Sequence, residues 1–266
     1  MGQADGRRAT ERPVAEERRR RIEELLRRQA VASLAEVIEV TGASEATVRR
    51  DLVLLERLGR LARTRGGARA IQRHSTLEEE FEIRQSRDRR EKRLIGQRAA
   101  RLVDDGTTAF LTDGTTSYAL AQCLVHRHLT VVTGALNIAQ LLAGSAGIEV
   151  IVLGGQLRAT SFGTTGALSL DTIRALHADV AFIAPDGVTL DGGVRDFSLD
   201  DAAIARAMSE NAARTVVLAS PGKIGVDTRV RIVDWPQVDV VVGARLPAPF
   251  ADGLARRGVE VITVAR

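Results

Sequence analysis

The sequence predicts an α/β protein of two domains, in which a small, mainly helical domain precedes a larger domain built on a mainly parallel β-sheet. Three observations support this prediction. The chain has 266 residues, which is enough for two domains with separate cores. Before about residue 71, apolar residues recur at helical spacing among many arginines. After residue 94, short apolar runs alternate with helical patterns, as in sheets covered by helices on both faces.

The composition indicates a soluble globular protein. Hydrophobic residues make up 44% of the chain and charged residues 27%. No apolar run approaches the roughly 20 residues of a membrane span. The first residues contain no apolar stretch of the kind found in secretory signals, so we expect a cytoplasmic protein. A single cysteine, Cys123, excludes an internal disulfide and a cysteine-rich zinc site.

The amino-terminal elements follow in order. Residues 1–14 are polar and contain glycines and a proline, so we expect a disordered basic tail. Residues 15–29 carry an apolar stripe in a charged run and are predicted to form the first helix. Ser33 and Glu36 have the spacing of a capping box, which predicts a second helix through Val40.

A third, short helix is predicted after Gly42. Ser44 stands at its start as a cap, and its buried face is predicted to consist of Val48, Leu52, Leu55 and Leu58. Thr47, Arg49 and Arg50 then point away from that face. Two guanidinium groups and a hydroxyl at the start of such a helix can bind guanine edges and phosphates in a major groove. The alternative is an ordinary amphipathic surface helix with solvated arginines.

The flanking segments favour a nucleic-acid interface. Helix, Gly-containing turn and helix make a helix-turn-helix. Residues 61–71 are predicted to form two strands around Gly66 and Gly67, which would supply the positive φ of a tight hairpin. Arginines on this hairpin give the candidate DNA-binding set Ser44, Thr47, Arg49, Arg50, Arg63, Arg65 and Arg69.

The distribution of charge agrees with this interpretation. Residues 1–73 hold 17 arginines and 11 acidic residues, a net charge of +6 in a chain whose net charge is +4. Phosphate neutralisation requires positive charge at the reader. A solvated basic face remains an alternative. Aromatic residues make up 3% of the chain and form no series, which argues against a platform for single-stranded nucleic acid.

The predicted domain boundaries follow from these segments. Residues 15–73 form the reader, residues 74–93 are a densely charged linker with the start of a helix, and residues 94–266 form the α/β domain. Its predicted strands are residues 108–112, 130–133, 149–153, 179–184, 215–219, 238–242 and 259–264. Its predicted helices are residues 94–103, 117–125, 138–142, 200–213 and 250–256.

Polar residues gather where these strands end, which is where open α/β sheets bind ligands. The first strand leads through Asp113 and Gly114 to Thr115, Thr116 and Ser117 at a helix start. Free backbone N–H groups, hydroxyls and a glycine together can cradle an anion. The alternative is a simple N-cap, which any such turn can have.

Later strand ends add more candidates. Thr133 follows the second strand, Arg158 the third, Asp186 the fourth and Lys223 the fifth. Lys223 is notable because the chain contains one other lysine, Lys92, among 38 basic residues. A compact ammonium after a strand is suited to a phosphate partner, although a lysine at a surface turn can also occur by chance.

The sequence contains no sign of a catalytic or metal centre. It lacks the P-loop, the dinucleotide-binding G-x-G-x-x-G and the nucleophile elbow. His126 and His128 stand two residues apart without a third ligand, which is typical of polar surface. We therefore expect no cofactor, no metal and no catalytic residue.

The chain resembles the deoxyribonucleoside-repressor (DeoR) family of bacterial regulators over residues 15–245. The first part of the resemblance consists of Ser44, residues 47–52, Leu55, Glu56, Gly59, Arg63, Gly66 and Gly67. The second part consists of residues 113–116, 130–133, Gly154, Gly155, Arg158, residues 179–182, Lys223 and Gly225. The resemblance implies a winged helix-turn-helix and a sensor domain related to ribose-phosphate isomerases. It also implies a repressor that a phosphorylated sugar releases from operator DNA.

Three positions depart from the family pattern. Gly134 stands where the family commonly has Asn, Ser220 where it commonly has Asp, and Pro185 where it has a small residue. The first two changes remove polar groups from the expected pocket, which affects the identity of the sugar more than the fold.

Two other functions are considered. An isomerase-like enzyme fused to a helix-turn-helix would use Asp113 or Asp186 as a base and Lys223 as an electrophile. Ser220 leaves that acid–base set thin. A winged helix used for protein contacts is disfavoured by the arginines of the hairpin. A homo-oligomer is expected because helix-turn-helix proteins usually read paired half-sites.

Overall fold

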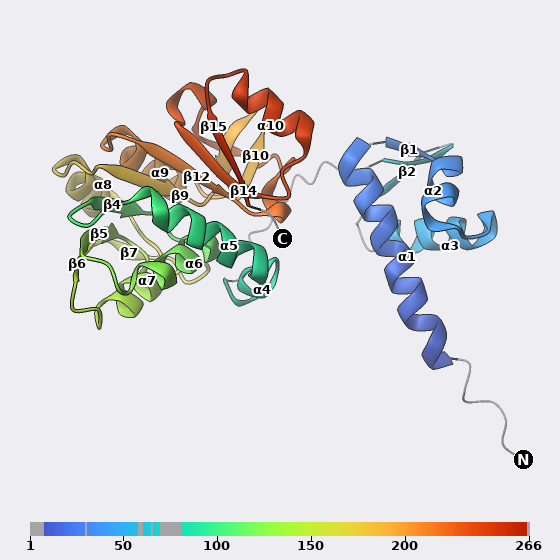
Figure 1. The fold of residues 1–266 in the computed structure, drawn as a ribbon, viewed down its shortest axis with the longest axis horizontal. Helices are drawn as coiled ribbons and strands as arrows, with labels where there is room; N and C mark the ends of the chain where they lie inside the picture. Colours follow the sequence, from blue (N-terminus) through green and yellow to red (C-terminus); the bar gives the residue numbers. More distant parts are fainter. Residues whose placement is uncertain (1–7, 30, 58–60, 65, 70–80, 265–266) are drawn as a thin grey trace, which may run out of the picture. The chain divides into compact units, whose positions relative to one another are not determined.

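The computed structural model describes residues 8–29, 31–57, 61–64, 66–69 and 81–264 (Figure 1). Leu58, Gly59, Arg65 and Ile71, which the sequence assigned to the reader, lie outside these ranges. The chain divides into two compact units, residues 1–72 and residues 73–266.

The first unit holds three helices and a small sheet among its described residues. Its elements are α1 (Arg8–Gln29), β1 (Val31–Ser33), α2 (Leu34–Thr41), α3 (Glu45–Arg57), β2 (Ala62–Thr64) and β3 (Gly67–Arg69). Helix α1 begins at Arg8, so the expected disordered tail is wrong for residues 8–14. Arg8, Ala9, Glu11 and Arg12 are good helix formers, and the helix runs from them through Pro13 into the predicted one.

Helix α2 has both of its predicted ends. The Ser33 hydroxyl accepts from the Glu36 N–H, and the Glu36 carboxylate accepts from the Ser33 N–H at 2.7 Å, which completes the capping box. The hydrogen bonds from Ser33 lower the pKa of Glu36. Gly42 ends the helix in the left-handed conformation, with φ at 64°, and donates to the carbonyl of Ile38. A glycine adopts this φ without strain.

The predicted apolar face of α3 is confirmed where it is described. Val48, Leu52 and Leu55 are buried, and they belong to one core with Ile22 and Leu26 of α1. The opposite side of α3 is therefore left for solvent or a partner.

The hairpin forms with a third strand that the sequence did not predict. The strand order is β1-β3-β2, and both pairs are antiparallel. The reason given for its glycines is wrong, because neither Gly66 nor Gly67 has a positive φ. Instead, a Cβ on Gly67 would lie 2.1 Å from the carbonyl oxygen of Ala32. Glycine is required here because β1 and β3 approach closely.

The second unit is organised around a seven-stranded sheet in which every neighbouring pair is parallel. In spatial order its strands are β15 (Glu260–Val264), β14 (Val240–Ala244), β12 (Thr215–Ala219), β9 (Val180–Ile183), β4 (Thr108–Leu111), β5 (Leu129–Thr133) and β6 (Ile148–Val152). Each coincides with a predicted strand to within two residues at either end, so the predicted fold class is confirmed.

Helices cover both faces of this sheet. They are α5 (Arg89–Ala99), α6 (Thr115–Leu124), α7 (Leu136–Leu142), α8 (Ala167–Arg174), α9 (Leu199–Glu210) and α10 (Ala248–Ala255). Side chains of α5, α6 and α7 share one apolar core with Leu111 and Val131. Side chains of α8, α9 and α10 share the other with Phe110 and Val132. Alternate residues of the same strands enter opposite cores, as the pleat requires.

Residues 81–93, predicted as a linker with the start of a helix, are more regular than a linker. Helix α4 (Phe81–Ser86) and residues 89–93 of α5 lie in this range. Phe81 and Lys92 are buried. The high density of charge concealed the two buried positions that attach the segment to the second unit.

Several short elements were not predicted in the second unit. They are α8, β7 (Gln156–Leu157), β8 (Thr164–Thr165), β10 (Gly187–Thr189), β11 (Gly193–Asp196), β13 (Val230–Val233) and the 3₁₀ turns η2 (Pro221–Lys223) and η3 (Trp235–Gln237). The 3₁₀ turn η1 (Ala100–Leu102) ends the helix predicted over residues 94–103. Within the described ranges, no helix has the length and apolar character needed to cross a membrane.

Candidate functional site

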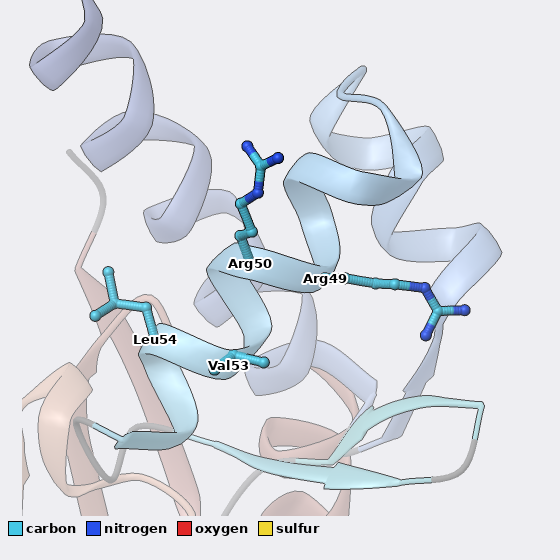
Figure 2. Close-up of a pocket in the computed structure, with 4 residues that line it drawn as sticks. All are labelled: Arg49, Arg50, Val53 and Leu54. Carbon is cyan, nitrogen blue, oxygen red and sulfur yellow. The ribbon is translucent and has the colours of Figure 1, made fainter.

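The exposed side of α3 carries the predicted reading residues. Arg49 and Arg50 are exposed and point away from the helix in different directions (Figure 2). Together with Val53 and Leu54, one turn further along, they line a surface hollow. Arg49 forms an ion pair with Glu45, at 2.7 Å between Nη2 and Oε1. The site therefore combines two guanidinium groups with an apolar patch.

The start of α3 differs in detail from the prediction. The carbonyl of Ser44 accepts from the N–H groups of Thr47 and Val48, as expected at a helix start. The Ser44 hydroxyl lies 2.9 Å from the hydroxyl of Thr47. This pair of hydroxyls lies at the start of the helix that carries the two arginines; Ser44 is exposed and Thr47 is half-buried.

A buried carboxylate fixes the other side of α3. Asp51 is 3% exposed and accepts from Arg18 at 2.5 Å and from Arg19 at 2.9 Å, both on α1. Two guanidinium groups satisfy its oxygens, so α3 is tied to α1 by charge as well as by packing. Sequence analysis missed this role, although Asp51 stands three residues after Val48 and thus near the buried face.

Of the three candidate arginines of the hairpin, the structure describes the side chain of Arg63. Arg63 of β2 is exposed; its N–H donates to Glu56 Oε1 at 3.1 Å, and its Nε lies 3.5 Å from Glu56 Oε2. Arg69 is in β3, paired with residues of β1 and β2, and Arg65 lies outside the described residues.

The second group of predicted residues lies where the strand order of the sheet reverses. From β4 the chain moves to β5 and β6 on one side, whereas β9 leads to β12, β14 and β15 on the other. Thr112 at the end of β4 donates to the carbonyl of Phe182 at 3.1 Å, and its hydroxyl accepts from Ala184 N–H at 3.0 Å. The loops after β4 and β9 are therefore side by side at the switch point, where such sheets form ligand crevices.

The loop after β4 has the features of an anion cradle. Gly114 has φ at 114° and precedes α6, so the backbone takes a conformation that favours glycine. Thr115, Thr116 and Ser117 are buried in the first turn of α6. Their N–H groups are those that a helix leaves without an internal acceptor.

Asp113 lies opposite the loop that joins β7 and β8, because a Cβ on Gly163 would come within 3.1 Å of the Asp113 carboxyl carbon. Thr133 is fully buried; its hydroxyl donates to the carbonyl of Leu111 at 2.9 Å and accepts from Ala135 N–H at 3.1 Å. Thr133 thus holds the backbone of two strand ends.

Asp186 and Lys223 are brought together across two strand ends. The Lys223 ammonium donates to Asp186 Oδ1 at 2.7 Å, and Asp186 is 7% exposed as a side chain. Arg84 of α4, which sequence analysis did not select, lies 3.5 Å from the same oxygen through Nη1. The strand-end cluster of Asp186, Lys223 and Arg84 therefore holds two cations on one carboxylate.

Arg158 does not join this cluster directly. It forms an ion pair with Asp201 in the first turn of α9, and its Nη2 lies 3.4 Å from the Thr160 hydroxyl. Thr160 nevertheless connects it to the cluster, because Arg84 donates to the Thr160 carbonyl at 3.1 Å.

The second lysine lies close to the first. Lys92 is 5% exposed and donates to the carbonyls of Arg84 and Arg87, the latter at 2.7 Å. Burial, followed by the charge of Lys223, lowers the pKa of Lys92 from 10.5 to about 8. Both lysines of the sequence therefore lie in the same region, although the scarcity of lysine was used to select Lys223 and not Lys92.

Comparison with known proteins finds a matching family model in each of the two units. The model of the DeoR-like helix-turn-helix domain matches residues 18–74, and that of the DeoR C terminal sensor domain matches residues 87–244. The HTH-type transcriptional repressor GlcR of Bacillus subtilis (strain 168) is 31% identical over 248 residues, covering 93% of this chain and 95% of that protein. The glycerol-3-phosphate regulon repressor of Escherichia coli (strain K12) is 30% identical over 219 residues, covering 82% and 86%.

Solved structures with a similar fold include ribose 5-phosphate isomerase A from Methanocaldococcus jannaschii. It has a TM-score of 0.38 and 17% sequence identity, over 50% of this chain and 53% of that one.

Proposed function

We propose, on the premise that this chain belongs to the DeoR family of transcriptional regulators, that it represses carbohydrate-metabolism genes and responds to a phosphorylated sugar. The sugar would bind in the second unit and weaken the binding of the first unit to operator DNA.

The observation that carries the DNA-binding part is that α3 has one buried face and one exposed face with arginines. Val48 and Leu55 bury one side and Asp51 ties it to α1, while Arg49 and Arg50 are exposed on the other. A helix held in this way presents its arginines in fixed directions, as reading of base edges requires. Phosphate contacts would come from Arg63, Arg65 and Arg69 of the hairpin, with Ser44 and Thr47 at the helix start.

The observation that carries the effector part is the presence of two cations on one carboxylate at the strand ends. Lys223 and Arg84 share the carboxylate of Asp186. In the same loop, Ala184 lies 3.6 Å from where a Cβ on Gly114 would stand, just before the first turn of α6. A phosphate group would find N–H groups and cations there. The relative from Escherichia coli is named for regulating a glycerol-3-phosphate regulon, which makes a phosphorylated small molecule a reasonable class of effector.

A sugar-phosphate isomerase fused to a helix-turn-helix is the second candidate function. It is supported by the carboxylates Asp113 and Asp186 and by Lys223 at a switch point. The relatives with which the chain shares 30% and 31% identity over most of its length are repressors by name, which favours a sensor.

Two measurements test the proposal. Fragments of the promoters nearest the encoding gene are titrated with the protein at low ionic strength. In parallel, hexose 6-phosphates, pentose 5-phosphates and glycerol 3-phosphate are screened for a rise in melting temperature, with the unphosphorylated compounds as controls. We expect one phosphorylated compound to raise the melting temperature and to weaken the binding of a promoter fragment. Conversion of that compound to product would favour the enzyme, and failure to bind any fragment would refute the repressor.

Lys223→Ala separates the two activities. We expect this variant to bind the promoter fragment like the wild type and to lose most of the response to the sugar phosphate. Arg174→Ala, which removes an exposed cation of α8, is the matched control and should respond normally. A full response in Lys223→Ala would exclude that lysine from the effector site.

We also propose that the protein is a homo-oligomer, because paired half-sites require at least two DNA-binding units. Light scattering of the purified chain tests this, and a monomer that binds its operator at one half-site would contradict it.

A further inference from the structure

Arg84 occupies the strand-end cluster although it belongs to no strand end. It is the fourth residue of α4, and its side chain is 10% exposed. One arm of its guanidinium faces Asp186, and the other donates to the Thr160 carbonyl in the loop between β7 and β8. The planar fork of an arginine can serve two acceptors at once, which a lysine cannot do in the same geometry.

Helix α4 contacts helix α6, the loop between β7 and β8, and Asp186 after β9. The ring of Phe81 packs edge to face against Phe162 of the β7–β8 loop, with 5.6 Å between centroids, and against Tyr118 of α6 at 6.0 Å. Asp88, just after α4, accepts from Gly222 N–H beside Lys223 at 3.0 Å. A ligand that rearranges these loops therefore acts on the surroundings of α4.

A buried lysine lies beside the end of α4. Lys92 donates to the carbonyls of Arg84 and Arg87 at the end of the helix, and its lowered pKa reflects burial and the nearby charge of Lys223. Besides burial, the charges of Lys223, Arg84 and Arg87 lower the pKa of Lys92, and the carboxylate of Asp88 raises it. Because burial makes uncompensated charge costly, a dianion entering this region gains from the cations and repels Asp186.

We propose that Arg84 is an effector-binding residue and that it couples the effector site to α4. The anion of the effector binds Arg84 or Lys223 in place of Asp186. Helix α4 then moves together with Arg84. The inference rests on the proposed sensor function. In the sequence, α4 is the first described element after the hairpin, with residues 70–80 between them. A change in α4 therefore occurs in the segment through which the chain enters the DNA-binding unit.

The test uses inorganic phosphate as the probe and the full-length chain. Phosphate affinity is measured by calorimetry, and amide hydrogen exchange of residues 81–99 is compared with and without saturating phosphate. Arg84→Gln removes the charge and the fork, whereas Arg84→Lys keeps the charge alone. Arg90→Gln, at an exposed position of α5, is the matched control for loss of one positive charge in the same segment.

In the wild type and in Arg90→Gln we expect phosphate to bind and to change exchange in residues 81–99. Arg84→Gln should bind phosphate about tenfold or more weakly, as loss of a charge-assisted hydrogen bond implies, and should show no change in exchange. Arg84→Lys should lie between the two. If Arg84→Gln does not fold, Arg84→Lys decides the matter, because wild-type affinity and exchange in that variant would overturn the inference.

The outcomes distinguish this inference from the sensor function itself. Wild-type phosphate binding and exchange in Arg84→Gln would overturn the role of Arg84 and leave the sensor intact. A wild type that ignores inorganic phosphate but is stabilised by a sugar phosphate would also overturn the inference alone. A wild type that responds to neither would overturn both.

Discussion

Arg49 and Arg50 are neighbours on α3, but their side chains have different surroundings. The guanidinium of Arg49 is held by Glu45 one turn earlier, in an exposed ion pair of the kind that contributes about 0.3–0.5 kcal/mol. To reach a base, Arg49 has to give up or share that carboxylate. The Arg50 side chain projects from the helix beside the apolar pair Val53 and Leu54 (Figure 2).

We therefore predict unequal losses on operator DNA. Arg50→Ala should weaken binding by about 1–3 kcal/mol if it reads a base. Arg49→Ala should lose less, because part of its contact energy is offset by release of Glu45. Fluorescence anisotropy at one fixed salt concentration measures both, and Arg20→Ala on α1 is the exposed control. Wild-type affinity in both α3 variants would remove the recognition-helix assignment.

Lys92 makes the stability of the second unit depend on pH. Its pKa is lowered to about 8 in the folded chain, whereas an exposed lysine titrates near 10.5. Below pH 8 both states carry the charge, and the folded state bears the cost of burying it. Between pH 8 and 10.5 the unfolded state binds more protons, so stability rises with pH in that interval.

The prediction compares the wild type with Lys92→Met from pH 7.5 to 10. The melting temperature of the wild type should rise relative to that of Lys92→Met as pH increases. Burial raises the pKa of Cys123, which acts in the opposite direction, but this thiol is present in both proteins and cancels in the comparison. A difference in melting temperature that is constant with pH would contradict the prediction.

Residues were predictable from the sequence where local pattern decides their environment. The apolar face of α3, the capping box of Ser33 and Glu36, and the pairing of strand-end residues such as Asp186 and Lys223 follow from spacing or from the rule for parallel sheets. Arg84 was missed because its partner, Asp186, is distant in sequence and its own segment is dominated by exposed charge. The site therefore gained a member that only the tertiary fold could identify.

At the scale of elements, α3 is positioned by Asp51. Its carboxylate is 4% exposed as a side chain, whereas the side chains of Arg18 and Arg19 are 17% and 33% exposed. Removing one partner of a buried ion pair typically costs about 3–5 kcal/mol. The two arginines reach water, which reduces that cost.

We predict that Asp51→Asn destabilises the packing of α3 against α1 by about 1–3 kcal/mol. Hydrogen exchange of the α3 amides reports this local stability without requiring the whole chain to unfold. Operator binding should weaken as well, because the direction of Arg49 and Arg50 depends on the helix. Asp171→Asn, which breaks an exposed pair with Arg174, is the matched control. Unchanged exchange in α3 would show that apolar packing alone holds the helix.

Strands of the large sheet were predicted more completely than the small ones. Strands β4, β9 and β12 are buried on both faces, so each appears in the sequence as a continuous apolar run. Strand β1 has three residues of which Ala32 alone is buried, and such a segment has no periodicity to detect. Likewise, the need for Gly67 arises from the approach of β1 and not from its own φ.

At the scale of the whole molecule, the two proposed activities must be linked. The charge of residues 1–73 is +6 and that of the chain is +4, so the positive charge that phosphate neutralisation requires lies in the first unit. Coupling then requires that the effector distinguish DNA-competent from DNA-incompetent states. A ligand that bound both equally would change nothing, however tightly it bound.

Linkage makes this requirement measurable in both directions. If the phosphorylated sugar weakens operator binding by some factor, operator DNA must weaken binding of the sugar by the same factor, commonly about 5- to 150-fold. We predict equal factors when calorimetry of the sugar is done with and without saturating operator, and anisotropy of the operator with and without saturating sugar. A scrambled DNA of the same length is the control for non-specific charge. Unequal factors would show that a further species, such as a change of oligomeric state, takes part in the equilibrium, and a factor of one would show that the sugar site does not regulate DNA binding.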